Sequence, residues 1–386
     1  MMTPLKMWCL LPLAVLLLLS ISPTETEVVQ LMSKACKGFL LNDRPPQVPG
    51  ILENGLIKQN KQKRYKAICQ TFQDEKRFVT LYDTENKIPV FSAYKYRGEQ
   101  KGRPEHVPWK IEPQLEDMEE INMEDCERVT YKHQASDYDY TNNNDYSRGH
   151  LFPVSYAFER SDKISTFTLT NIVPQASSFN KGSWDKMEHC VQCILKTYCS
   201  NQEAYVVTGA SPSKDTQKNK LNEKVNIPSV LWSAFCCQGK DKKTFLAGAH
   251  WGKNTADCTS KYLEMRTLKE LQQTFGIDVF PKTDCPSTVT VAELYPKQIK
   301  SQCDCTFQPL TTSAPPAATN QQFIDFLYRS RTFCRICKYQ GSVKAEGHQK
   351  KKLKDLCLKL KHNGLRSEDI DEAIKKFLLK LLKSDF

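Results

Sequence analysis

The chain has 386 residues, of which 40% are hydrophobic and 26% are charged. This composition is typical of a globular protein and argues against a largely disordered one, and the length allows one large core or two smaller ones. The net charge of +11 favours an acidic partner such as nucleic acid or an anionic surface, although a requirement for solubility alone would also explain it.

Residues 1–22 are predicted to be a signal peptide. Lys6 supplies a positive charge, the apolar run from Leu10 to Leu19 follows it, and small residues come next at Ser20 and Ser22. The run is too short to span a bilayer and lies at the N-terminus, so the pattern favours secretion over a membrane anchor. We therefore expect a secreted protein whose mature chain is soluble, since no later stretch approaches 18 consecutive apolar residues.

Removal of Cys9 with the signal peptide leaves 15 of the 16 cysteines. In an oxidising compartment most of them should form disulfides, and the odd number implies one free thiol or an intermolecular bridge. The pairs Cys190/Cys193, Cys303/Cys305 and Cys334/Cys337 could suggest zinc, but their mutual spacing is irregular. Disulfides are the preferred interpretation, and their connectivity stays open.

The first predicted secondary structure is a β-hairpin at residues 77–96, where two β-rich runs flank the turn-prone segment DTEN. Residues 98–147 are polar, and the tract SDYDYTNNNDYS favours turns. This region is either a solvated loop or a lid that delivers His150 to a site, with tyrosines that could stack on bases. Arg97, just past the hairpin, is a further candidate for contact with a phosphate.

The segment 145–188 contains the most informative pattern. Phe167 to Val173 alternates and is rich in β-branched residues, which predicts a strand ended by Pro174. Apolar residues spaced at three and four predict a helix from about Asn180 to Cys199. The candidate site residues in and around these elements are Arg148, His150, Asn171, Asn180 and Glu188, the last four separated by 21, 9 and 8 residues.

The predicted helix carries Asn180, Trp184 and Glu188 within an arc of about 80° at roughly 100° per residue. Mg²⁺ prefers oxygen ligands and keeps most of its waters, so an Asn oxygen with a nearby Glu can suffice. A neutral histidine can take a proton from water at pH 7, and an arginine can hold a phosphate by two parallel bonds. Together they suit phosphodiester hydrolysis; the alternative is a surface loop, a strand and an ordinary amphipathic helix.

The stretches SRGHLFPVSYAF and TLTNIVPQASSFNKGSW, followed by Glu188, resemble the DNA/RNA non-specific endonuclease family, the ββα-metal or His-Me finger group. Within it, the chain is similar to the endonuclease domain-containing 1 subgroup from CKGFLLNDRPP through WSAFCC. The resemblance covers about residues 30 to 300 and does not include the C-terminal region. It implies an α+β fold with a mixed or antiparallel sheet and a ββα-metal motif.

The resemblance implies a role for each matching residue. His150 would be the general base, Asn180 the ligand of Mg²⁺ or Mn²⁺, and Arg148 the contact to the scissile phosphate. Asn171 would orient the site, and Glu188 would hold metal-bound waters or neighbouring groups. One position departs from the family pattern: Ser147 stands where the family has Asp, which puts full activity in doubt, and Asp145 could substitute only if the loop bends back.

Beyond the central segment, alternating runs predict further strands and a helix. Cys236 and Cys237 should point to opposite faces of one strand and not pair with each other, and His250 is expected to be structural. The tract 211–226 is expected to be an exposed lysine-rich loop. The predicted elements are strands at residues 204–210 and within 227–250, and a helix from Tyr262 to Phe275 closed by Gly276.

The C-terminal part differs in composition. Residues 308–320 are rich in proline and small residues and are predicted to be a linker after a nuclease-like domain at 23–307. Residues 321–386 carry 16 Lys+Arg against 8 Asp+Glu, with amphipathic helical spacing. They are either a basic appendage that binds nucleic acid or an acidic membrane, or a small helical bundle with a lysine-rich surface.

Two functions from different classes remain. The first is a secreted, Mg²⁺-dependent endonuclease acting on DNA, RNA or both. The second is a catalytically weakened protein that binds nucleic acid or a protein partner on the same scaffold, which Ser147 favours. A third, membrane-active function of the basic tail predicts that residues 321–386 bind liposomes. Oligomeric state is left open by the sequence.

Overall fold

The computed structural model describes residues 28–141, 143–215, 219–257, 262–303, 305, 347–362, 375, 376 and 378. The predicted signal peptide, the predicted linker and most of region 321–386 lie outside the described residues. In the described part of that region, helix α11 spans Gly347–His362, and Leu353 and Leu356 on it are buried, in agreement with an amphipathic helix. Within the described ranges, no helix combines the length and the apolar character needed to cross a bilayer.

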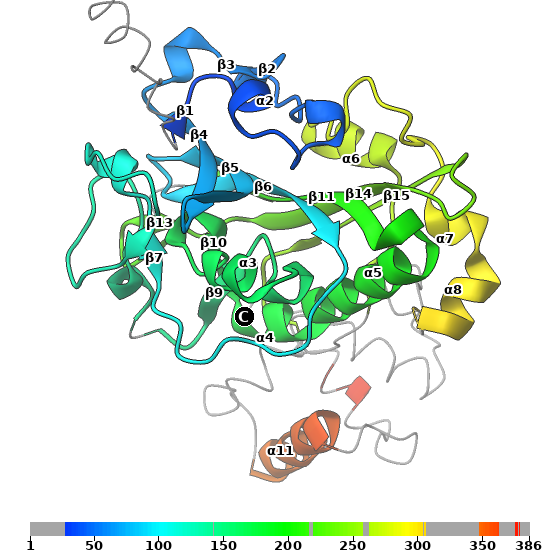
Figure 1. Ribbon diagram of the computed structural model, residues 1–386. Helices are drawn as coiled ribbons and strands as arrows, with labels where there is room; N and C mark the ends of the chain where they lie inside the picture. The colour runs from blue at the N-terminus through cyan, green and yellow to red at the C-terminus, as the bar shows by residue number, and fades with distance from the viewer. Residues whose placement is uncertain are drawn as a thin grey trace, which may run out of the picture.

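A seven-stranded sheet lies at the centre of the fold, and every pairing in it is antiparallel (Figure 1). The order is β1-β4-β5-β6-β11-β14-β15. The predicted hairpin and the later predicted strands are confirmed as β5, β6, β11, β14 and β15. The bounds are β1 Val28–Val29, β4 Tyr65–Phe72, β5 Glu75–Asp83, β6 Ile88–Arg97, β11 Glu203–Ser211, β14 Val230–Gln238 and β15 Phe245–Lys253.

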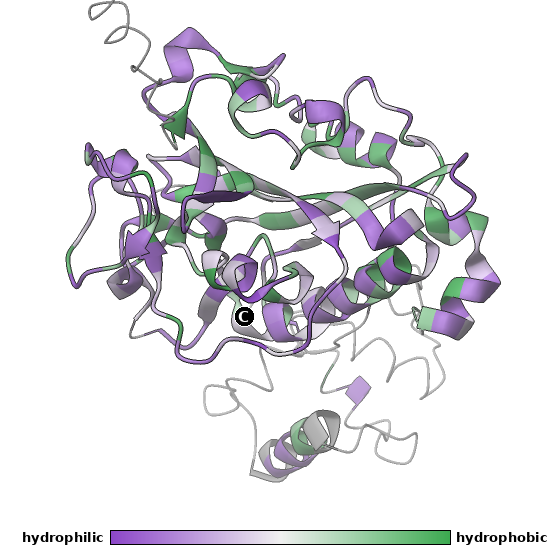
Figure 2. Ribbon diagram, viewed as in Figure 1, coloured by the Kyte–Doolittle hydropathy of each residue, from purple (hydrophilic) through white to green (hydrophobic). Residues whose placement is uncertain are grey.

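A hydrophobic core lies on each face of this sheet. Successive side chains along a strand point to opposite faces, so each strand contributes to both cores. On β6, Phe91 and Ala93 belong to one core, whereas Tyr94 and Tyr96 belong to the other. The first core lies under α2 (Met32–Ala35) and α6 (Leu268–Phe275), and the second under α5 (Asp185–Tyr198). Hydrophobic residues accordingly concentrate along the sheet and the helix faces that meet it (Figure 2). The α+β prediction is confirmed.

The smaller elements connect these layers and lie at their edges (Figure 1). Two-stranded ribbons form from β2 with β3, β7 with β8, and β12 with β13. Their bounds, with the remaining short helices, are β2 Leu52–Glu53, β3 Leu56–Ile57, β7 Lys110–Ile111, β8 Glu124–Asp125, β12 Lys220–Leu221, β13 Val225–Asn226, α3 Arg160–Ser165, α7 Val291–Leu294 and α8 Pro296–Cys303.

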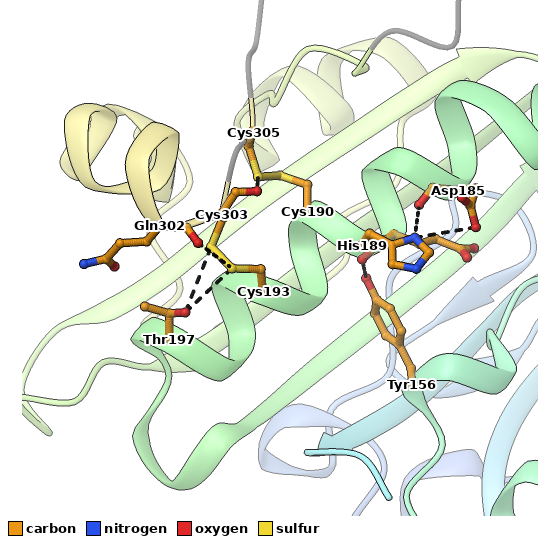
Figure 3. Close-up of a disulfide and its surroundings, with 10 residues drawn as sticks. Tyr156, Asp185, His189, Cys190, Cys193, Thr197, Gln302, Cys303 and Cys305 are labelled. Atoms are coloured by element: carbon orange, nitrogen blue, oxygen red, sulfur yellow. Dashed lines mark hydrogen bonds and ion pairs between the residues drawn. A yellow bond between two sulfur atoms is a disulfide. The ribbon is translucent and has the colours of Figure 1, made fainter. Parts of the chain in front are cut away.

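Five disulfides join pairs of described residues, and they confirm the preference for disulfides over zinc at Cys190/Cys193 and Cys303/Cys305. Two of them join α5 to the chain at the end of α8 (Figure 3). Cys236 and Cys237 lie in opposite cores and pair with different partners, as predicted. Cys126 is a free thiol. The pairs are Cys36–Cys69, Cys190–Cys305, Cys193–Cys303, Cys199–Cys237 and Cys236–Cys285.

The helix predicted from Tyr262 begins later, at Leu268, so the N-terminal part of that prediction is wrong. Arg266 exchanges two backbone hydrogen bonds with Ala249 of β15, which holds the preceding residues extended. The Thr267 hydroxyl then accepts a hydrogen bond from the Glu270 N–H at 3.1 Å and caps the helix. Gly276, at φ 75°, ends it as predicted.

His250 on β15 is only 3% exposed, and neither ring nitrogen has a hydrogen-bond partner. Burial lowers the pKa of His250 to about 3, so the folded protein binds no proton there while the unfolded chain does below about pH 6.5. Stability contributed by this group is therefore present above pH 6.5 and is lost as pH falls toward 3. We expect His250→Phe to reduce the acid-side slope of unfolding free energy by about 1.4 kcal/mol per pH unit.

This slope is measurable by urea unfolding of the non-reduced protein between about pH 4 and pH 7. His189→Gln removes an exposed histidine and is the matched control, expected to leave the slope unchanged. Equal slopes for the wild type and His250→Phe would show that His250 does not carry this pH dependence.

Candidate active site

Two antiparallel strands and a helix form the unit that holds the predicted site residues. Strand β9 (Tyr146–His150) pairs with β10 (Ile172–Ala176), with His150 opposite Ile172. The chain then continues into the helical segment Ser177–Phe179 (α4), the wide π-type turn Asn180–Trp184, and α5. This succession of two strands and a helix is the ββα arrangement that the sequence implied (Figure 1).

The strand predicted at Phe167 to Val173 is displaced, and the prediction that Pro174 ends it is wrong. Residues 169–171 form a 3-10 turn, and the strand runs through Pro174 to Ala176. Strand β10 pairs with β9 alone in its two-stranded sheet, so a proline without an N–H is tolerated at its open edge. The displacement leaves Asn171 in a turn rather than in a strand.

The helix predicted from about Asn180 to Cys199 is largely confirmed, but its first turn is not a regular α-turn. Gly182 departs from helical geometry at φ −111° and ψ −113° within the turn. Asp257 stabilises the turn by accepting two hydrogen bonds from Ser183, one from its N–H at 3.0 Å and one from its hydroxyl. The spacing of 100° per residue therefore does not apply between Asn180 and Trp184.

His150 ends β9 in an aromatic surround. Its ring lies 5.2 Å from that of Phe167 and 5.5 Å from that of Trp109, measured between centroids. The residue is half-buried, and its Nε2 is buried without a hydrogen-bond partner. Burial, with a smaller effect of the Arg103 charge, lowers the pKa of His150 to about 3. The imidazole is therefore neutral at pH 7 and can accept a proton.

Asn180 is held by Ser147. Its Nδ2 donates a hydrogen bond of 2.9 Å to Ser147 Oγ, and Ser147 Oγ donates in turn to the Gln175 carbonyl at 3.3 Å. The amide oxygen, Oδ1, has no hydrogen-bond partner among the described residues. The Ser147 hydroxyl thus accepts one hydrogen bond and donates another. Together they fix the Asn180 amide so that the amide oxygen is available to a ligand.

Glu188 lies in the first turn of α5. Burial, reinforced by the nearby charge of Asp185, raises the pKa of Glu188 to about 8. The Trp184 indole and the Arg103 charge oppose this rise to a smaller extent. A cation near this carboxyl would favour its charged form, so the raised pKa suits a group that works beside a metal.

Arg148 occupies an aromatic slot, with Cζ 5.5 Å from the ring centroids of both Trp109 and Tyr140. Its Nη2 donates a hydrogen bond of 3.0 Å to the Asp137 carbonyl and lies 2.5 Å from Asp137 Oδ1. Its Nε is buried without a partner. The sequence led us to expect that Arg148 could donate two parallel hydrogen bonds to a phosphate. In the structure Nη2 already binds Asp137, so it is not available for such a pair.

Asn171 is completely buried and fully hydrogen-bonded. Its Oδ1 accepts from the Ser92 hydroxyl and from the Phe152 N–H, both at 2.9 Å. Its Nδ2 donates to the carbonyls of Phe152 and Thr166 at 3.1 and 3.0 Å. Asn171 therefore cannot touch a substrate, but it fixes the chain two residues after His150.

No side-chain hydrogen bond joins any two of the five candidate residues within the described ranges. Asn180 reaches β9 through Ser147, and His150 and Glu188 are related through Arg103, whose charge affects the pKa of both. Arg103 was missed in the sequence, where it is one of several charged residues in a polar loop. It is exposed, stacks over Phe167 at 5.8 Å, and forms no ion pair with a described carboxylate. Arg97, by contrast, pairs with Asp162 at 2.9 Å.

The residues present fit a hydrated Mg²⁺ better than a metal held by the protein alone. Across the described ranges, no three His, Cys, Asp or Glu side chains cluster as metal ligands. One free amide oxygen and a carboxyl of raised pKa match a cation that retains most of its water.

Comparisons with known proteins identify the family of the chain. A model of the DNA/RNA non-specific endonuclease family matches residues 58–284. Endonuclease domain-containing 1 protein of Homo sapiens is 32% identical over 252 residues, which cover 62% of this chain and 45% of that protein. Nuclease of Serratia marcescens is 26% identical over 135 residues, covering 34% of this chain and 50% of that protein.

One solved structure, from "Crystal structure of the EndoG/EndoGI complex: Mechanism of EndoG inhibition", superposes at a TM-score of 0.42 and 18% identity, covering 57% of this chain and 90% of that one. The matches to the human and Serratia proteins span half of their length or less. The family model, however, covers more than half of this chain. The chain therefore belongs to the DNA/RNA non-specific endonuclease family.

Proposed function

We propose that the protein is a secreted, metal-dependent endonuclease that hydrolyses phosphodiester bonds of DNA, RNA or both. The observation that carries the proposal is the ββα unit, which ends one strand in a neutral histidine with a free nitrogen. The same unit carries, at the start of the π-type turn that leads into α5, an asparagine whose amide oxygen has no partner among the described residues. These two groups, His150 and Asn180, would be the general base and the metal ligand.

In this proposal His150 takes a proton from the attacking water. A general base must be unprotonated at working pH, and the lowered pKa of His150 meets that condition throughout the neutral range. Phe167 and Trp109 limit the rotation of the ring. Asn171 would be a positioning residue, because its bonds to Phe152 fix the backbone that follows His150.

Asn180 Oδ1 would hold Mg²⁺ or Mn²⁺, with Glu188 accepting hydrogen bonds from the water around it. When bound, the cation supplies stabilisation of the negative charge that develops on the phosphoryl group and the leaving oxygen. Ser147 would keep the amide oxygen turned toward the cation, because it holds the amide nitrogen. Arg148, and Arg103, which pairs with no described carboxylate, would supply positive charge for the phosphate.

Recognition through phosphate implies little base preference, since backbone contacts carry no direct sequence information. The family resemblance further implies products with 5′-phosphate and 3′-hydroxyl ends. Five disulfides suit an oxidising compartment, which supports secretion together with the predicted signal peptide. A nucleic-acid or membrane contact by residues 321–386 stays a prediction.

The proposal is tested by nicking of supercoiled plasmid by the purified mature chain. We expect relaxed plasmid with Mg²⁺, none with chelator, and recovery when Mg²⁺ is added back, because the amide oxygen alone offers no charge to stabilise the transition state. Cutting that persists in chelator would exclude a metal-dependent site. A well-folded protein that cuts neither DNA nor RNA with Mg²⁺ or Mn²⁺ would exclude the enzyme.

The alternative, a catalytically weakened protein that binds nucleic acid or a protein partner, is favoured by one observation. Ser147 offers a neutral hydroxyl where the family has a carboxylate. In the same assay this alternative predicts binding of plasmid without nicking, and a gain of nicking in Ser147→Asp.

A further inference from the structure

Resting on the proposed function, we propose that Asp137 is a positioning residue that fixes Arg148 for contact with the substrate phosphate. Asp137 lies outside the family motif, eleven residues before Arg148, in the loop that the sequence predicted to be irregular. Two of its oxygens converge on one nitrogen of Arg148. The carbonyl accepts a hydrogen bond from Nη2 at 3.0 Å, and Oδ1 lies 2.5 Å from Nη2 as an ion pair.

One short turn supplies both the acidic partner and a wall of the Arg148 slot. Residues 137–140 form a 3-10 turn, in which side chains three apart lie on the same side. Asp137 and Tyr140 are three apart, so the carboxylate and the ring face Arg148 together. Tyr140 lies under the guanidinium at 5.5 Å from Cζ and is itself buried.

The turn is anchored firmly enough to act as a fixed support. Asp139, which is 1% exposed, accepts hydrogen bonds from the N–H and the hydroxyl of Ser136 at 2.8 and 3.1 Å. Its other carboxylate oxygen accepts from Asn222 at 3.3 Å. The Asp137 N–H donates to the Cys126 sulfur at 3.4 Å. The position of Asp137 is therefore set by its neighbours and not by Arg148 alone.

The contacts of Nη2 determine which nitrogen of Arg148 is available to a ligand and in which direction it points. Trp109 and Tyr140 both lie against the guanidinium, but cation–π contacts allow it to rotate in its plane. Asp137 removes that rotation. Nε is buried, so Nη1 is the nitrogen left without a partner among the described residues. Arg148 should thus present one preorientated donor group, at a lower entropic cost than a free side chain.

A double-mutant cycle tests this. Binding of a labelled single-stranded oligonucleotide is measured in chelator, where no cleavage occurs, for the wild type, Asp137→Asn, Arg148→Gln and the double variant. We expect each single substitution to weaken binding about tenfold, as for one lost charge-assisted hydrogen bond. The double variant should bind no more weakly than Arg148→Gln, because Asp137 acts through Arg148.

Glu203→Gln is the charge-matched control. Glu203 pairs with Lys95 on the central sheet, and its substitution removes one negative charge as Asp137→Asn does. We expect it to bind as tightly as the wild type. Melting temperatures of all variants separate a loss of folding from a loss of positioning. A merely structural role for Asp137 would lower the melting temperature without this coupling to Arg148.

Three results would overturn the inference: tighter binding by Asp137→Asn, which would make the carboxylate a competitor of phosphate; unchanged binding; or additive losses in the double variant. If the wild type nicks plasmid, any of these three results contradicts the role of Asp137 but not the proposed function. A wild type that binds the oligonucleotide but never cuts it contradicts the proposed function alone. A wild type that does not bind contradicts both.

Discussion

Replacing His150 by alanine is expected to lower kcat for plasmid nicking by at least about 10²-fold, the usual contribution of a general base. KM should change little, because the imidazole is proposed to accept a proton and not to bind the phosphate. The comparison requires purified protein at saturating Mg²⁺, with circular dichroism to confirm that the variant is folded. His189→Ala is the matched control, since His189 is an exposed histidine on α5.

The surroundings of His150 offer a second test. Alanine would leave a space between the rings of Phe167 and Trp109, which lie 5.2 and 5.5 Å from the imidazole. Imidazole added to the solution should therefore enter that space and restore part of the nicking rate to His150→Ala. The same addition should not raise the rate of the wild type or of His189→Ala. A His150→Ala protein that retains nearly wild-type kcat would end the general-base assignment.

The sequence predicted the scaffold well where local pattern and burial agree. The hairpin of β5 and β6 and the strands β11, β14 and β15 are rich in apolar and β-branched residues, because each strand buries side chains in two cores. The predictions failed where a tertiary contact overrides the pattern. Residues 262–267 have helical spacing, but Arg266 among them pairs with Ala249 of β15. Residues 167–171 have strand spacing, but they turn, and Asn171 bonds Phe152 and Thr166.

In the candidate site, too, some residues could be predicted from local sequence patterns and others depend on tertiary contacts. His150, Asn180 and Glu188 belong to one family motif, which indicates them together. Arg103 and Asp137 lie outside that motif, in a long polar loop whose local sequence does not specify its fold. Local sequence patterns equally give no way to see that Ser147 would bond Asn180, because this contact joins strand β9 to the π-type turn.

Asn180→Ala should be the second large loss, and it should differ in kind from the loss in His150→Ala. Removing the amide oxygen removes the proposed metal ligand, so nicking should fall by about 10²-fold or more at a fixed Mg²⁺ concentration. Part of the rate should return as Mg²⁺ is raised. His150→Ala should show no such recovery, because its metal ligand is intact. Titrating the nicking rate with Mg²⁺ for both variants therefore separates the two roles.

Ser147→Ala provides the graded comparison. It keeps the Asn180 oxygen but removes the acceptor that orients the amide, so its requirement for Mg²⁺ should rise by about 10- to 100-fold, as for other lost partners of metal ligands. Binding of Mn²⁺ followed by electron paramagnetic resonance gives the same order without reference to catalysis: wild type tightest, Ser147→Ala weaker, Asn180→Ala weakest. If Asn180→Ala bound Mn²⁺ as tightly as the wild type, the metal would have to lie elsewhere, because the amide oxygen is the ligand on which this order depends.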